Sequence, residues 1–270
     1  VFSHDEWIEG ASKDYVFVAL DFPNGPEAKA KVPNPERNQE LNEKYGIRGY
    51  PTILLMTHDG VAYAQTGYQA GGPEKYLEHM AEIATKGKAA LAATQAVAAS
   101  FEAAEGDAKW AAWDKLVETF NGLDDGSPFV SVLADHVRWG IENDPKNENG
   151  KKLVALKALL KAGLGDEKML ATAKEMDPKN EHGLLERVAE ASFGMVRDDV
   201  TARAALKALD EINDLGFKDS ELGFDLNLTA AGWCAGPLAD PDGKAAYAEI
   251  AQEIGTEDED KLAALRQLIG

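Results

Sequence analysis

Cysteine is nearly absent from the sequence, and long apolar runs are absent altogether. Cys234 is the only cysteine among the 270 residues, so neither an internal disulfide nor a metal site built from several cysteines can form. No stretch reaches the roughly 18 consecutive apolar residues of a membrane-spanning helix, so we expect no membrane span. The five histidines lack metal-ligand spacing, and no phosphate-binding loop or Gly-X-Ser-X-Gly motif occurs. We therefore expect no metal and no cofactor.

Positive charge is scarce. The 28 lysines and arginines stand against 47 aspartates and glutamates, which gives a net charge of −19 and a pI of about 4.6. The imbalance is spread along the chain, because residues 1–85 hold 7 basic and 13 acidic side chains and residues 86–270 hold 21 and 34. Such a surface repels phosphate backbones, and no basic stripe interrupts it. We therefore expect no nucleic-acid partner.

The most informative pattern in residues 1–85 is a proline at the start of an apolar strand. Gly49-Tyr50-Pro51-Thr52 follows a helix predicted over 36–45 and precedes the apolar run Ile53–Met56. Proline cannot donate a hydrogen bond to a β-ladder, so it is tolerated at strand starts, edges and bulges. The pattern therefore predicts a helix, a short loop and a strand in this order.

Further elements are predicted on both sides of this loop. Tyr15–Phe22 is an almost continuous run of apolar residues, many of them β-branched or aromatic, which predicts a central strand covered on both faces. Asp59-Gly60 is a hairpin signal between strands predicted at Ile53–Met56 and Val61–Gln65. Pro73 is well placed as the first residue of the next helix.

The order of helix, strand, helix, proline loop, hairpin and helix resembles the thioredoxin family over residues 1–85. The most specific parts of the resemblance are Tyr45–Thr52, the Asp59-Gly60 turn and Gly67. It implies a thioredoxin-like fold, incomplete at its N-terminus because the family's first strand and Cys-X-X-Cys would precede Val1. It also implies a periplasmic or secreted location and a cis Tyr50–Pro51 bond. The implied substrate-binding residues are Gly49, Tyr50, Pro51 and Thr52.

From residue 86 onward the composition changes to alanine, leucine, lysine and glutamate, without further strand signals. Short turns that contain glycine, aspartate or proline separate the periodic segments. We therefore predict an all-helical domain over 86–270, after a domain over 1–85. Its expected helices are 88–104, 107–120, 128–142, 150–162, 166–176, 181–194, 199–215, 221–234, 242–254 and 257–269.

One internal echo lies in this second part. The sequence Asp-Pro-Lys-Asn-Glu-X-Gly occurs at 144–150 and again at 177–183, and a weaker Asp-Pro-Asp-Gly follows at 240–243. A period near 33 residues is typical of stacked helix pairs such as tetratricopeptide-like repeats. The predicted fold class is thus α/β plus all-α: an incomplete thioredoxin-like fold followed by a solenoid-like repeat domain.

Two features could carry chemistry or binding in the helical part. Cys234 lies among small and aromatic residues, which indicates a buried core thiol, with a reactive cysteine as the alternative. Trp110 and Trp113 lie on one helical stripe with Leu116, which indicates core packing, with a peptide-binding groove as the alternative. Neither feature supplies the cysteine pair that thiol–disulfide exchange needs.

Three functional hypotheses follow. The first is a thioredoxin-like protein whose longer parent exchanges disulfides, although this chain has no catalytic residue of its own. The second is a non-catalytic interaction module with a protein or peptide partner. The third is a glutathione-transferase-like arrangement, which also joins a thioredoxin fold to a helical domain. It is weaker because Gly67-Tyr68-Gln69 follows the hairpin where that family has an acidic residue and serine.

Overall fold

The computed structural model covers residues 1–270 and describes all of them except 1, 24, 46, 48 and 125. The chain divides into two compact units, Val1–Asp135 and His136–Gly270. Helices hold 65 % of the described residues, and the described strands form one two-stranded sheet. Within the described chain, none of the helices combines the length and the apolar character that crossing a membrane requires.

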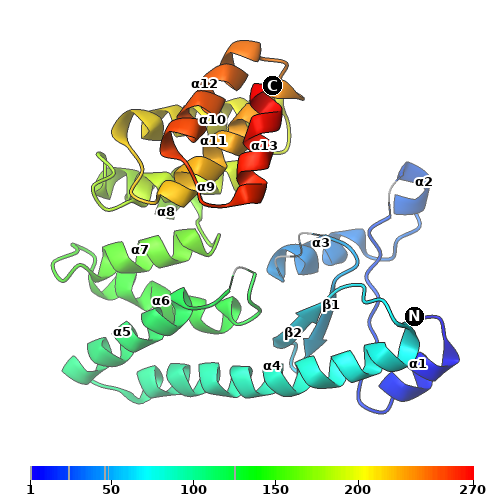
Figure 1. Ribbon diagram of the computed structural model, residues 1–270. Helices are drawn as coiled ribbons and strands as arrows, with labels where there is room; N and C mark the ends of the chain where they lie inside the picture. The colour runs from blue at the N-terminus through cyan, green and yellow to red at the C-terminus, as the bar shows by residue number, and fades with distance from the viewer. Residues whose placement is uncertain (1, 24, 46, 48, 125) are drawn as a thin grey trace. The chain divides into compact units, whose positions relative to one another are not determined.

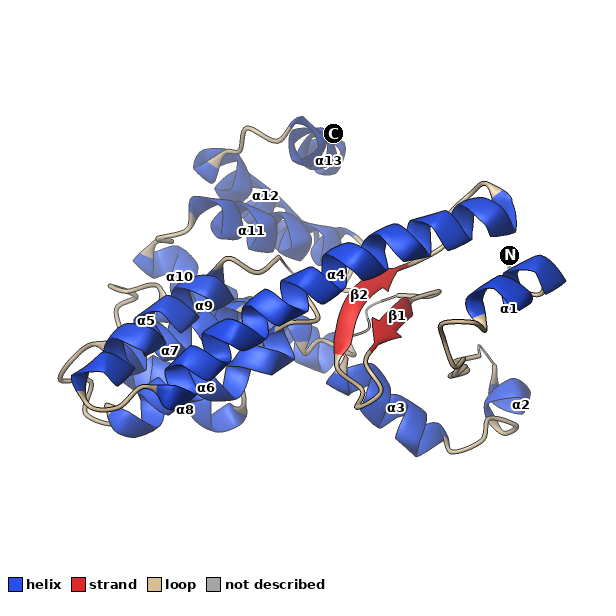
Figure 2. Ribbon diagram, turned by 90° about the horizontal axis from the view of Figure 1, so that it is seen from below, coloured by secondary structure: helices blue, strands red, loops and turns tan. Residues whose placement is uncertain are grey.

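The N-terminal unit, Val1–Asp135, combines a β-hairpin with helices. Figures 1 and 2 show the hairpin between α3 and the long helix α4. Its core gathers side chains from α1, both strands and α4, among them Trp7, Leu55, Tyr63 and Tyr76. The bounds of its elements are α1 (Asp5–Ala11), α2 (Pro26–Lys29), α3 (Pro35–Lys44), β1 (Ile53–Met56), β2 (Ala62–Thr66), α4 (Gly72–Ala103) and α5 (Asp107–Asn121).

The hairpin forms where it was predicted. β1 and β2 pair antiparallel with Leu55 opposite Ala64, and the register shifts after Leu55. Gly60 has the positive φ, 82°, that a tight Asp-Gly turn requires. The Tyr45 hydroxyl donates a hydrogen bond to the Gly60 carbonyl at 3.0 Å, which fixes the chain after α3 against the turn.

A single helix of 32 residues, α4, follows the hairpin. Pro73 lies in its first turn, as predicted, and Tyr76 and Met80 are buried in the core that α4 shares with the sheet. The helix predicted separately over 88–104 is part of α4, which continues through Gly87 and ends at Ala103. The change of composition after residue 85 therefore falls inside a continuous helix.

The predicted thioredoxin-like fold class is wrong for this unit. That fold needs a larger central sheet, whereas the described strands are β1 and β2 alone. The predicted central strand Tyr15–Phe22 is neither helix nor paired strand, and Val16 and Val18 in it face solvent. An apolar run becomes a strand only where a neighbour takes up its N–H and C=O groups. Here β1 and β2 pair with each other, and no described strand pairs with this run.

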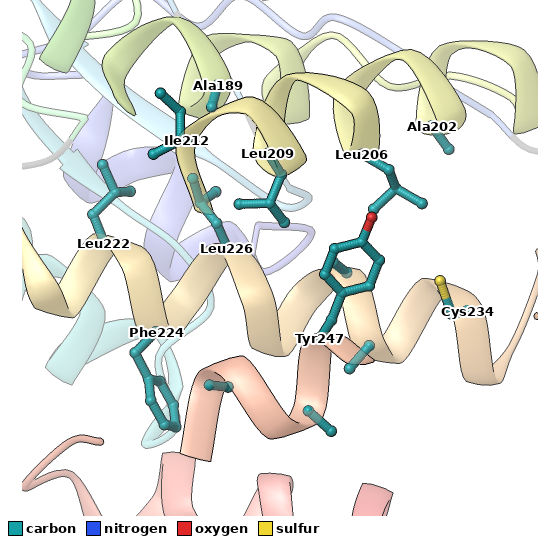
Figure 3. Packing of buried hydrophobic residues seen from close by; sticks show 14 of the residues in the cluster. Ala189, Ala202, Leu206, Leu209, Ile212, Leu222, Phe224, Leu226, Cys234 and Tyr247 are labelled. Carbon is teal, nitrogen blue, oxygen red and sulfur yellow. The ribbon is translucent and has the colours of Figure 1, made fainter. Parts of the chain in front are cut away.

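The C-terminal unit, His136–Gly270, consists of helices joined by short loops, with no strand among its described residues, and its helices lie within three residues of the predicted bounds. The helix α6 (Val130–Asn143) spans the division between the units. Figure 3 shows Leu206, Leu209 and Ile212 of α10 facing Leu222 and Leu226 of α11. The other helices are α7 (Lys151–Lys161), α8 (Glu167–Met176), α9 (Leu184–Gly194), α10 (Asp199–Leu215), α11 (Ser220–Ala235), α12 (Pro241–Ile254) and α13 (Glu259–Ile269).

The two copies of Asp-Pro-Lys-Asn-Glu-X-Gly form the same loop. The Asp144 carboxylate accepts hydrogen bonds from the amides five and seven residues later at 3.1 and 2.9 Å, and Asp177 does so at 3.0 Å for both. Asn147 and Asn180 both have positive φ, and each side chain accepts from the amide six residues later. The repeat predicted from sequence is thus a repeat of structure, consistent with helical repeats.

The weaker third copy does not form this loop. Asp240 is itself the N-cap of α12, where its carboxylate accepts from the Gly243 amide at 3.0 Å. Pro241 is the first residue of that helix, a position that needs no amide donor. The weaker third copy of the sequence is therefore an N-cap at the start of a helix and not a third copy of the repeated loop.

Candidate functional site

The predicted substrate-binding residues lie in an exposed loop of the N-terminal unit. Gly49, Tyr50 and Pro51 are exposed and Thr52 is half-buried. The Tyr50–Pro51 peptide bond is cis, as predicted. The Thr52 hydroxyl donates to the Gly49 carbonyl at 2.7 Å, which closes the loop on itself. These four residues are therefore brought together at the surface, immediately before β1.

Two contacts hold Tyr50 in place. Its hydroxyl donates to Asn42 Oδ1 of α3 at 3.0 Å. Its ring stacks on Phe22, with ring centroids 5.0 Å apart and 21° between the ring planes. Although it makes both contacts, Tyr50 remains 60 % exposed. The loop therefore presents an aromatic surface beside the end of the Tyr15–Phe22 segment, a juxtaposition that sequence reasoning did not predict.

Within Tyr15–Phe22, some side chains contact other parts of the unit and others lie in solvent. Tyr15 packs against the core, and burial, with the neighbouring Tyr15 hydroxyl as the second cause, raises the pKa of Tyr63 to about 12. The Phe17 ring stacks on Trp7 at 4.7 Å. Val16 and Val18 are 94 % and 80 % exposed. The segment therefore contacts its surroundings through Tyr15, Phe17 and Phe22 and leaves Val16 and Val18 to solvent.

The backbone of this segment is also unpaired. Before it, the Tyr15 amide donates to the Ala11 carbonyl at 2.9 Å, and after it the Asp21 carbonyl accepts from Asn38 Nδ2 at 3.4 Å. Between these points, among the described residues, no backbone hydrogen bond involves Val16–Leu20. Unpaired N–H and C=O groups next to apolar side chains form a template for another strand. We name Val16, Val18, Leu20, Phe22 and Tyr50 the apolar edge.

Apolar exposure is concentrated in this part of the chain. Single exposed apolar side chains are normal on any protein, but a group of them marks a binding surface. Within the described residues, the exposed large apolar side chains before residue 70 are Phe2, Ile8, Val16, Phe17, Val18, Leu20, Tyr50 and Tyr68, and those after it are Val154, Met195, Val200, Leu215 and Ile269.

Cys234 is a core thiol, as predicted. It is 1 % exposed on α11, in the core that Figure 3 shows. Burial raises the pKa of its thiol, and the Asp240 carboxylate raises it further; Arg203 lowers the pKa by less, and Asp210 adds a still smaller increase. A reactive cysteine needs an accessible site that favours the thiolate. Cys234 has the opposite environment.

The tryptophan stripe is also part of a core. Trp113, Leu116, Val117 and Phe120 of α5 are all buried. The ring of Trp110 packs edge-on against Trp113 with centroids 5.9 Å apart. The predicted packing role is confirmed, because the side chains that would line a groove are covered.

Sequence reasoning missed two adjacent buried ionisable residues on α9, Glu186 and Arg187. Glu186 is fully buried, and its Oε2 accepts from the Lys218 amide at 2.7 Å. Arg187 pairs with Glu190 of the same helix at 2.9 Å and with Asp219 at 2.5 Å. These contacts fix α9 to the loop between α10 and α11. The local sequence Leu-Leu-Glu-Arg-Val reads as an ordinary amphipathic helix and carries no signal for them.

No group of three or more histidine, cysteine, aspartate or glutamate side chains that could hold a metal ion occurs among the described residues. Comparison of the chain with models of protein families, with curated proteins and with solved structures gave no match.

Proposed function

We propose that this chain is a non-catalytic interaction module that binds an extended polypeptide along the apolar edge, with Gly49–Thr52 lining one end. The observation that carries the proposal is the unpaired backbone of Val16–Leu20, a stretch that includes the exposed valines Val16 and Val18. Extended peptides bind other proteins in this way: backbone hydrogen bonds supply affinity, and contacts of alternate side chains supply specificity.

The exposed valines give the interaction its free energy. Fully burying a valine side chain stabilises a complex by about 1.5–3 kcal/mol before the entropy cost of association. Val16 and Val18 have nearly all of this burial still available. Tyr50, with its ring held by Phe22, adds an aromatic contact whose conformation is already restricted. The partner expected from this geometry has apolar side chains at alternate positions.

The charge of the chain favours a basic partner. Residues 1–85 alone hold 13 acidic and 7 basic side chains, and such a field accelerates encounter with a positively charged segment. We therefore expect a partner with lysine or arginine around its apolar residues, and binding that weakens as ionic strength rises.

Fluorescence anisotropy with a labelled peptide tests this proposal. The peptide alternates valine and threonine over nine residues and carries lysine at both ends. We expect the double variant Val16→Ser/Val18→Ser to bind about tenfold more weakly or worse, because it removes two apolar contacts. The matched control is Val200→Ser on α10. This valine is 77 % exposed, and we expect no peptide to bind there.

The same assay separates strand pairing from non-specific adhesion. A peptide N-methylated at every residue cannot donate backbone hydrogen bonds, so we expect it not to bind. Equal affinity of the methylated peptide, or equal affinity of the double variant and Val200→Ser, would refute the proposal.

Thiol–disulfide exchange by a longer parent protein stays a prediction, as does a periplasmic or secreted location. Exchange needs a second cysteine and an accessible thiolate. The 270 residues supply one cysteine, and it is buried with a raised thiol pKa.

A further inference from the structure

We propose that one face of α7 binds an acidic segment of another polypeptide. We name Lys151, Val154, Lys157 and Lys161 the lysine face. It belongs to the C-terminal unit, whereas the apolar edge belongs to the N-terminal unit, so the inference does not rest on the proposed function. A surface of one charge attracts partners of the opposite charge and disfavours those of its own.

Positive charge, scarce in the chain as a whole, is concentrated in α7. Its 11 residues include four lysines and no aspartate or glutamate, whereas every other described helix holds at least one acidic residue. Without these lysines the remaining residues carry 24 basic and 47 acidic side chains, a net charge of −23. This helix is therefore a local exception to the acidic surface expected from the sequence.

The lysine face is one side of the helix. Its members follow one another at intervals of three, three and four residues, which places them together on an α-helix. Val154 is 39 % exposed and Lys161 is exposed, and the other two lysines are half-buried. The remaining lysine, Lys152, lies on the other side, and its ammonium donates to the Pro145 carbonyl at 3.2 Å. The buried residues of α7 are Ala155, Leu156, Ala158, Leu159 and Leu160.

The second copy of the repeat shows how the equivalent face is covered. In α9, 33 residues later, Arg187 and Glu190 stand where α7 has Val154 and Lys157. Arg187 is 5 % exposed and pairs with Glu190 and with Asp219, the N-cap of α11. On α7, among the described residues, no carboxylate lies within 4 Å of the Lys157 ammonium. Carboxylates of the chain thus pair with this face of α9, and the face of α7 lacks them.

The ammonium groups of the lysine face keep donors for a ligand. The Lys157 ammonium donates to the His182 carbonyl at 3.0 Å, and an ammonium has three donors. Burial raises the pKa of Asp219, and Lys161 is the weakest of the groups that lower it. This carboxylate already pairs with Arg187, so it does not neutralise Lys161. Lys157 and Lys161, four residues apart, repel each other, and a bound carboxylate relieves that repulsion.

The length and composition of the face select the partner. Lys151 and Lys161 are ten residues apart, which is about 15 Å along a helix, and an extended chain covers this length in about five residues. Val154 lies between Lys151 and Lys157, so the matching segment has an apolar residue between carboxylates. A nucleic acid fits less well, because its phosphates continue beyond this length and meet the acidic remainder of the chain.

Fluorescence anisotropy with a labelled acidic peptide tests the inference. The peptide has two glutamates on each side of one leucine, and its control, which should not bind, has glutamine in place of glutamate. At low ionic strength we expect Lys157→Gln/Lys161→Gln to bind the acidic peptide roughly fivefold more weakly than wild type. The matched control is Lys168→Gln/Lys174→Gln on α8, which removes the same charge from two exposed lysines. It should change the dissociation constant by less than about twofold.

A second variant separates loss of the contact from loss of the fold. Val154→Ser should weaken binding of the leucine peptide about threefold and leave unchanged the binding of a peptide with serine in place of leucine. Absence of binding, equal weakening by the α7 and α8 variants, or tighter binding of an oligonucleotide of equal charge would overturn the inference. Val16→Ser/Val18→Ser should bind the acidic peptide like wild type, so failure at one surface leaves the proposal for the other intact.

Discussion

Gly87 of α4 lies against the backbone of Tyr63 in β2, so closely that a β-carbon added to Gly87 would overlap the Tyr63 carbonyl oxygen and stand 2.9 Å from its carbonyl carbon. The long helix and the hairpin thus pack backbone against backbone at this point. A glycine in a helix interior ordinarily costs about 1 kcal/mol relative to alanine. Here its missing side chain is what lets the helix approach the strand.

Replacing this glycine should therefore destabilise the protein. We expect Gly87→Ala to lower the free energy of unfolding by about 1–3 kcal/mol, because helix and strand must separate to admit the methyl group. The matched control is Gly232→Ala in α11, where an added β-carbon meets nothing within 4 Å, and where we expect a gain of about 0.5–1 kcal/mol. Urea unfolding measures the free energy of unfolding of both variants. A Gly87→Ala variant more stable than wild type would contradict the close contact between α4 and β2.

The repeated loops should contribute equally. Asp144 and Asp177 each accept two amide hydrogen bonds while almost fully buried, and hydrogen bonds to a charged acceptor are worth about 1.5–3 kcal/mol each. We expect Asp144→Ala and Asp177→Ala to cost similar amounts in thermal or urea unfolding. Asp240→Ala, which removes one capping bond, should cost about 1 kcal/mol. If Asp240→Ala cost as much as the other two, the loops would not be a distinct repeated structure.

Acid should weaken the Arg187–Asp219 ion pair. Burial raises the pKa of Asp219, but the Leu222 amide and Arg187 lower it by more, so the folded pKa lies below the unfolded value. Such a carboxylate stabilises the fold above the unfolded pKa, about 3.9, and the contribution is lost as pH falls through the folded pKa. We expect Asp219→Asn to be less stable than wild type at pH 7, with the difference shrinking below about pH 4.

The control for this pH profile is Glu211→Gln, an exposed carboxylate on α10. Its difference from wild type should be small at pH 7 and nearly constant on acidification. Chemical unfolding at a series of pH values measures both variants. If the difference in unfolding free energy between Asp219→Asn and wild type did not change with pH, the Arg187–Asp219 ion pair would not contribute to stability.

The thiol of Cys234 should be inert in the folded protein. Because burial raises its pKa and covers the sulfur, we expect a disulfide reagent to label it only after unfolding, while an exposed Val200→Cys thiol reacts at once. In the presence of dithiothreitol the chain should reduce insulin no faster than a protein-free blank. Faster reduction by wild type than by Cys234→Ala would establish a redox activity that the structure does not support.

Sequence patterns located most helices because each combines apolar periodicity with its own stop signals. Asp-Pro, Gly and Asn mark the turns, and positive φ at Asn147 and Asn180 is a conformation that asparagine tolerates well. The pattern failed after residue 85, where the change of composition predicted a new domain and a separate helix over 88–104, whereas α4 continues through Gly87, which lies against Tyr63. This contact joins a helix and a strand that are distant in sequence, so the local pattern around Gly87 does not encode it.

The candidate site was predicted only in part. The loop at Gly49–Thr52 could be found because proline before an apolar run is a strong local signal. The segment Tyr15–Phe22 was predicted to be a covered strand, since periodicity reports how apolar a run is and not whether partners are available to it. Its exposure, and its approach to Tyr50 through Phe22, depend on contacts between residues almost 30 positions apart.

Hydrogen–deuterium exchange at the amides of Val16–Leu20 tests most directly whether this segment is an unpaired strand that accepts a partner. The measurement uses protein dilute enough to be monomeric, with and without saturating valine–threonine peptide. We expect these amides to exchange freely in the protein alone and to become protected with the peptide, while the amides of α10 do not change. Protection in the protein alone, or unchanged exchange with bound peptide, would contradict the proposed function.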